Sequence, residues 1–133
     1  MPLANPYQRY QSTAVKTADR GDLLLLTYEA LLRWLARADE AIDGGKPVEA
    51  HQALIACQDL VRNLAAGLNY EQGGDVAERL GALYDYFHRQ LMEANALKDK
   101  ALIASVRQLV SPLLDAWRVA VPTARKQGHL QGV

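Results

Sequence analysis

Four stretches of the chain repeat apolar residues at steps of three and four. The first stretch sets the pattern with Leu24, Tyr28, Leu31, Leu35, Ala38 and Ile42. The pattern recurs in Ala50, Leu54, Cys57, Val61, Leu64 and Leu68, then in Val76, Leu80, Leu83, Phe87, Leu91 and Ala94, and last in Ile103, Val106, Val110, Leu113, Trp117 and Ala120. Steps that average close to 3.5 residues are the period of helices packed side by side with a left-handed supercoil. The spacing therefore predicts four amphipathic helices that each bury one stripe.

Turn-forming and capping residues divide these stretches and predict helices at about residues 20–43, 47–68, 75–95 and 99–121. The connections between them are short, and β-branched residues nowhere alternate with polar ones as in a strand. Because short connections make consecutive helices antiparallel neighbours, we expect an all-α fold. The predicted architecture is an antiparallel up-down four-helix bundle over residues 19–121.

The two ends of the chain lack this period. Residues 1–18 are polar, contain Pro2 and Pro6, and predict an extended N-terminal arm. Residues 122–133 begin with Pro122 and predict a flexible C-terminal tail. Inside the fourth helix, Pro112 predicts a bend, because proline removes one backbone donor and crowds the preceding turn.

Composition narrows the class of function. The chain has 133 residues, 50% hydrophobic and 23% charged, which is typical of one folded domain. Fifteen basic and fifteen acidic residues give zero net charge, without the basic excess that nucleic-acid binders usually show. Apolar runs such as residues 23–26 are far shorter than the roughly 20 residues of a membrane span, and no signal peptide is recognisable. We expect a cytoplasmic protein without membrane insertion.

Catalytic chemistry finds little support in the sequence. A carboxylate-bridged metal site in a helical bundle needs inward Glu residues with two Glu-x-x-His pairs, and Asp85 with His88 is a single, off-stripe approximation. The lone Cys57 lies on a buried stripe, where it acts as a small hydrophobe. We therefore expect no enzyme activity, no cofactor and no metal.

Apolar and aromatic side chains outside the stripes are the candidate binding residues. Leu25 and Leu32 lie on one flank of the first helix's stripe and Trp34 on the other, at about 100° per residue. Tyr86 points about 120° away from the third helix's stripe, and an arm without a core carries Tyr7 and Tyr10. The predicted partner-binding residues are Tyr7, Tyr10, Leu25, Leu32, Trp34 and Tyr86. The arm, a second copy or another protein could cover this surface.

Six short motifs, in order, resemble the flagellin export chaperone family FliS. They are Asn5-Pro6-Tyr7-Gln8-Arg9-Tyr10, Val15-Lys16-Thr17-Ala18, the apolar run from Leu23 to Tyr28-Glu29, Gly73-Gly74 followed by Val76-Ala77-Glu78-Arg79-Leu80, Leu83-Tyr84-Asp85-Tyr86 through Leu91 to Ala94-Asn95, and Asp115-Ala116-Trp117. None of these motifs alone is specific to the family. Their common order and spacing over about residues 5–120 are specific to it.

The resemblance implies a chaperone that binds the C-terminal segment of flagellin, which becomes helical when bound. It implies that the chaperone prevents premature polymerisation and assists delivery to the flagellar type III export apparatus, whose components are further expected partners. It implies no catalytic group. The alternative is a self-associating helical-bundle adaptor with no client. The sequence predicts a monomer or a weak homodimer and does not decide between them.

Overall fold

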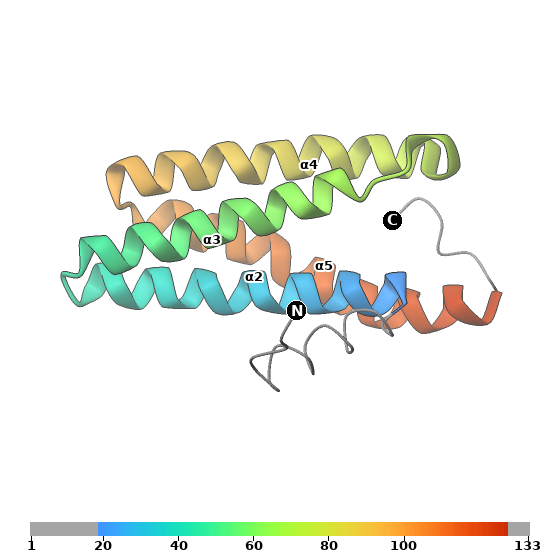
Figure 1. The fold of residues 1–133 in the computed structure, drawn as a ribbon, viewed down its shortest axis with the longest axis horizontal. Coiled ribbons are helices and arrows are strands. Elements are labelled where there is room, and N and C mark those ends of the chain that lie inside the picture. Colours follow the sequence, from blue (N-terminus) through green and yellow to red (C-terminus); the bar gives the residue numbers. More distant parts are fainter. Residues whose placement is uncertain (1–18, 128–133) are drawn as a thin grey trace, which may run out of the picture.

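The computed structural model describes residues 19–127, which form four helices and no strand. These are α2 (Arg20–Asp43), α3 (Pro47–Ala66), α4 (Tyr70–Leu97) and α5 (Lys100–Gln127). Each helix packs on its neighbour in the chain, and α5 closes the ring against α2 (Figure 1). The predicted antiparallel up-down bundle is confirmed. The arm with Tyr7 and Tyr10, and residues 128–133 of the predicted tail, lie outside the described residues.

Local capping explains where most helices begin. The Asp19 carboxylate accepts a hydrogen bond of 2.8 Å from the backbone N–H of Asp22, and so caps α2. Pro47 occupies the first turn of α3, where its missing N–H costs nothing. Between α4 and α5, Lys98 adopts a left-handed conformation, and the Asp99 carboxylate then accepts from the N–H of Ala101.

Helix α4, the third in the chain, begins earlier than expected. The Asn69 side chain accepts from the N–H of Gln72 and caps one extra turn, which starts at Tyr70. Gly74 then breaks the helix with φ 52° and ψ −128°, a conformation that glycine adopts without steric cost. The stretch 69–74, predicted as a connection, is therefore a capped turn followed by a kink.

Helix α5, the fourth in the chain, ends later than expected. It continues through Pro122 to Gln127, so residues 122–127 are helical and do not belong to a flexible tail. Arg125 in these turns forms ion pairs with Asp19 and Asp22 at the start of α2, and no local sequence pattern reveals those contacts. The helix also continues through Pro112, and Figure 1 shows that its first, orange half and its last, red half do not follow one line.

Buried apolar side chains from all four helices form one core, which contains no buried charge. Helices α2 and α3 bury the predicted stripes almost unchanged. In α4 the buried positions include Ala77 and Tyr84, whereas Val76 is 56% exposed and Leu83 is only half-buried. Beyond Pro112 the buried residues are Leu114 and Val121. A straight helix has 3.6 residues per turn, so a stripe drawn at 3.5 loses phase along a long helix.

Candidate functional site

Helix α5 has two chemically different flanks. Lys100, Arg118 and Arg125 lie on the flank toward α2, and each forms ion pairs with α2. The Nζ of Lys100 lies 2.6 Å from Asp43, and the guanidinium of Arg118 lies 3.2 Å from Glu29. Three basic side chains thus join α5 to α2 and its N-cap along the length of the helix. Within residues 19–127 no ion pair joins α5 to α4.

The opposite flank of α5 is apolar and faces α4. At about 100° per residue, Leu102, Leu113 and Trp117 lie across the helix from the three basic residues. All three are half-buried and pack against the core. On α4, Asn95 bonds to His51 of α3, which places α3 beside that flank and leaves the other flank for α5.

The α5-facing flank of α4 carries Leu83 and Tyr86, which are also half-buried. We call the surface formed by Leu83, Tyr86, Leu102, Leu113 and Trp117 the α4–α5 seam. It is uncharged and partly open to solvent along two helices. Its chemistry suits an apolar helix or extended segment of another protein.

A buried polar cluster lies beneath this seam. The hydroxyls of Tyr28 on α2 and Tyr84 on α4 are 2.7 Å apart across the core. The ring of Trp117 packs 6.4 Å from that of Tyr28, and thereby connects the cluster to the seam. Burial raises the pKa of both tyrosines, so both hydroxyls stay protonated and able to donate. The buried indole Nε1 of Trp117 meets no partner among residues 19–127 at full hydrogen-bond geometry, although its proximity to the Tyr28 hydroxyl partly offsets the rise in the pKa of Tyr28.

The structure distributes the sequence-predicted binding residues over three places. Tyr86 lies on the α4–α5 seam, where its ring packs 6.2 Å from that of Phe87. Leu25 and Leu32 share a flank of α2 with Glu29, which pairs with Arg118, so both leucines face α5. Trp34 lies on the α3 side of α2.

Trp34 lines an open pocket of about 390 Å³ between the end of α2 and the start of α3. The Arg37 guanidinium lies 4.5 Å from the centre of its ring, a cation–π contact. Glu40, Lys46 and Glu49 also line the pocket, so its wall carries charges of both signs. The two flanks of α2 are therefore each partly covered by a neighbouring helix, and less apolar surface is left free than the sequence suggests.

Among the described residues, the side chains that the sequence offered for catalysis or metal binding have surroundings that do not suit those roles. Cys57 is fully buried, and burial raises the pKa of its thiol to about 12, so a nucleophilic thiolate does not form near neutral pH. Asp85 pairs with Arg89 at 3.2 Å, an ordinary contact one helical turn away. Residues 19–127 contain no group of three or more His, Cys, Asp or Glu arranged to hold a metal ion.

Sequence reasoning missed four of the five members of the seam, and one of them, Leu102, was not singled out at all. Leu83, Leu113 and Trp117 were expected in the core stripe, and the structure places them half-buried beside it. A signal was available in Leu114, which lies next to Leu113 and offers an equally apolar core position.

Among the described residues, no helix is both long and apolar enough to cross a membrane.

The ring of helices, the apolar seam and the mixed-charge pocket define the class of this protein as an all-α, antiparallel four-helix bundle. Residues 3–124 match the family model described as flagellar protein FliS. The chain is 33% identical over 132 residues to the flagellar secretion chaperone FliS of Bacillus subtilis (strain 168), covering 99% of this chain and 98% of that one. It is 34% identical over 116 residues to the protein of the same name in Salmonella typhimurium, covering 86% of each. The chain belongs to the FliS family of flagellar proteins.

A solved structure shares the fold. A crystal structure described as a flagellar chaperone from bacteria superposes with a TM-score of 0.74 over 92% of this chain and 99% of that chain. Because the two sequences are only 20% identical, this likeness supports the arrangement of the helices alone.

Proposed function

We propose that this protein is a cytoplasmic, non-enzymatic export chaperone for flagellin. It binds the C-terminal segment of flagellin, prevents that segment from polymerising too early, and assists delivery to the flagellar type III export apparatus. Membership of the FliS family supports the proposal, as does the name flagellar secretion chaperone carried by relatives from Bacillus subtilis and Salmonella typhimurium. Components of the export apparatus are proposed as later partners.

The α4–α5 seam is the observation that carries the proposal. A subunit that assembles through an apolar helical face needs that face shielded beforehand, and the seam offers uncharged, half-buried side chains along two helices. A segment that folds on binding can cover a long surface at moderate affinity, because part of the interaction energy offsets the entropy of ordering. Moderate affinity suits a client that must be released again.

The client contacts follow from this placement. Tyr86 contributes a large ring with a polar tip, which suits the centre of a contact. Leu25 and Leu32 extend the apolar surface around α5 on its α2 side, and Trp34 offers a separate contact at the α2–α3 end. Tyr7 and Tyr10 complete the proposed set from the arm.

Titration calorimetry with the flagellin C-terminal segment tests this site. Tyr86→Ala should weaken binding by at least about 1 kcal/mol, roughly fivefold, as loss of an interface aromatic often does. Met92→Ala is the matched control, since Met92 is 51% exposed on another face of the same helix. Equal affinities for Tyr86→Ala and the wild type would contradict the placement of the site on the seam.

Co-purification separates the client role from self-association. Full-length flagellin should be retained by the chain, and flagellin lacking its C-terminal segment should be lost. The alternative, a bundle that uses exposed apolar residues such as Leu26 and Val119 to pair with itself, predicts a dimer in light scattering and no retention of either flagellin.

A further inference from the structure

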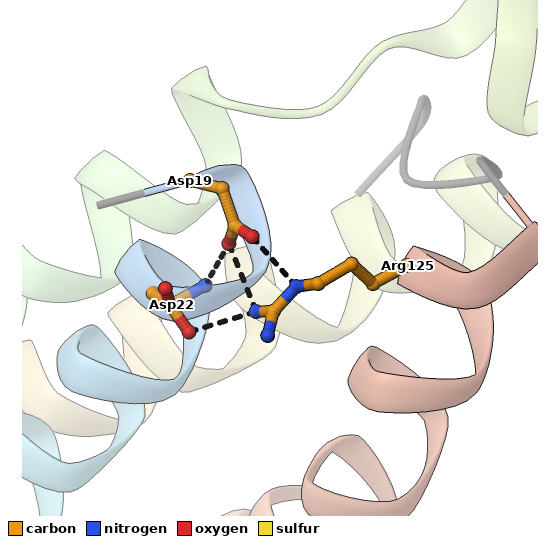
Figure 2. A network of polar contacts seen from close by, with 3 residues as sticks. All are labelled: Asp19, Asp22 and Arg125. Carbon is orange, nitrogen blue, oxygen red and sulfur yellow. Dashed lines mark hydrogen bonds and ion pairs between the residues drawn. The ribbon is translucent and has the colours of Figure 1, made fainter. Parts of the chain in front are cut away.

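One arginine joins the beginning of α2 to the end of α5. In Figure 2, the Arg125 guanidinium reaches both Asp19 and Asp22. Its Nε lies 2.6 Å from Asp19 Oδ2, and its Nη2 donates to Asp19 Oδ1 at 3.1 Å and to Asp22 Oδ1 at 2.8 Å. Two nitrogens of one planar group thus engage two carboxylates. We call Asp19, Asp22 and Arg125 the terminal clamp.

The clamp shares a carboxylate with the helix cap of α2. Asp19 Oδ1 also accepts from the backbone N–H of Asp22, so one oxygen serves both contacts. The hydrogen bond from that N–H, together with the Arg125 contacts, lowers the pKa of the Asp19 carboxyl, so the group stays ionised near neutral pH. Asp19 is the N-cap of α2 and Asp22 lies in its first turn, where negative charge is also favoured by the helix dipole.

Beyond the ion pair of Arg118 with Glu29 at 3.2 Å, few contacts among the described residues fasten this end of α5. Among residues 115–126, Val121 is the single buried side chain, and Val119 is 72% exposed. Pro122 removes one backbone hydrogen bond within the same turns. The last turns of α5 therefore depend on the clamp more than the middle of the helix does.

The same half of α5 carries Leu113 and Trp117, which form part of the α4–α5 seam. We propose that the terminal clamp positions the C-terminal half of α5 and so preforms the α5 wall of the client-binding seam, with Arg125 as the positioning residue. The link to the client rests on the proposed function, whereas the link to α5 does not. A preformed wall binds a client with less loss of conformational entropy than a frayed one.

Hydrogen exchange of the free, full-length chain tests the structural part. Arg125→Gln should speed exchange of amides in residues 113–127 by roughly threefold to tenfold, while the first half of α5 stays protected. Asp22→Asn should produce a smaller effect in the same amides, because the Asp19 contacts remain. The double variant should exchange no faster than Arg125→Gln alone, because both changes remove the same contact.

Arg107→Gln is the matched control for charge and position. Arg107 lies on α5, is exposed, and takes part in none of the ion pairs formed among residues 19–127. Its loss removes one positive charge from the same helix and should leave exchange of residues 113–127 unchanged. Unchanged exchange in Arg125→Gln, or full additivity of Asp22→Asn and Arg125→Gln, would overturn the clamp.

Calorimetry with the flagellin C-terminal segment tests the functional part. Arg125→Gln should weaken binding roughly threefold or more, and Arg107→Gln should leave it unchanged. Faster exchange with unchanged affinity would overturn the role of the clamp in the seam. If the wild-type chain binds no flagellin at all, the proposed function fails, while the exchange data still decide whether the clamp holds α5.

Discussion

The hydroxyls of Tyr28 and Tyr84 make a hydrogen bond whose removal can be predicted in magnitude. They lie 2.7 Å apart, and the two side chains are 0% and 1% exposed, so water cannot replace a lost partner. Tyr84→Phe removes one hydroxyl and leaves that of Tyr28 buried without its partner. The free energy of unfolding should fall by about 1–3 kcal/mol, which is the cost of leaving one buried polar group unpaired.

The double variant Tyr28→Phe/Tyr84→Phe distinguishes this mechanism from a simple loss of contacts. It leaves no orphaned hydroxyl, and its apolar rings keep nearly the same shape, so it should be about as stable as the wild type or at least more stable than Tyr84→Phe. The coupling free energy between the two sites should thus be about 1 kcal/mol or more.

Urea unfolding of the four proteins, followed by circular dichroism, measures this cycle. The slope of unfolding free energy against urea should not differ between variants if the folded state stays compact. Tyrosine absorbance during a pH titration adds a second readout, because both pKa values are raised by burial. If the losses for the two single variants simply add in the double variant, the hydroxyl pair is not the stabilising feature.

Two further variants test the core. Phe87→Ala removes a fully buried ring and should lower the free energy of unfolding by about 3–5 kcal/mol in urea melts, whereas a loss below 1 kcal/mol would contradict its central packing. Burial raises the pKa of the Cys57 thiol from 9.0 to about 12, so the folded state holds its proton more tightly than the unfolded chain does. The contribution of the protonated thiol to the free energy of unfolding is therefore complete below pH 9 and is lost as the pH rises toward 12. Between these pH values the free energy of unfolding should fall less for Cys57→Ala than for the wild type, because the variant has no thiol to titrate. Identical pH dependence for the two proteins would refute the assignment.

The local pattern of residues was sufficient for the helices themselves. A stripe of apolar residues at steps of three and four, with Pro47 at a helix start and short connections, determines four antiparallel helices. These signals act over one or two turns, so they are readable from neighbouring residues alone. The ordered motifs from Asn5 to Trp117 likewise indicated the family that the family model then matched.

Tertiary packing decided which side chains form the binding surface. Leu25, Leu32 and Trp34 look alike as apolar flanks of one helix, yet the first two face α5 and the third faces α3. The periodicity of a helix is the same whichever neighbouring helix it packs against. Its own sequence therefore does not predict which flank a neighbour covers. The choice depends on contacts such as Arg118 with Glu29, which lie 89 residues apart.

The end of α5 shows the same division between local and distant causes. Pro122 is a local signal for a helix end, and by itself it predicts a tail. Yet the helix continues to Gln127, and in these last turns Arg125 meets Asp22 across 103 residues of chain. The sequence by itself determined the number, kind and order of the helices, because these depend on neighbouring residues. The tertiary structure alone decided the seam and the end of the last helix, because both depend on groups that meet only after the chain has folded.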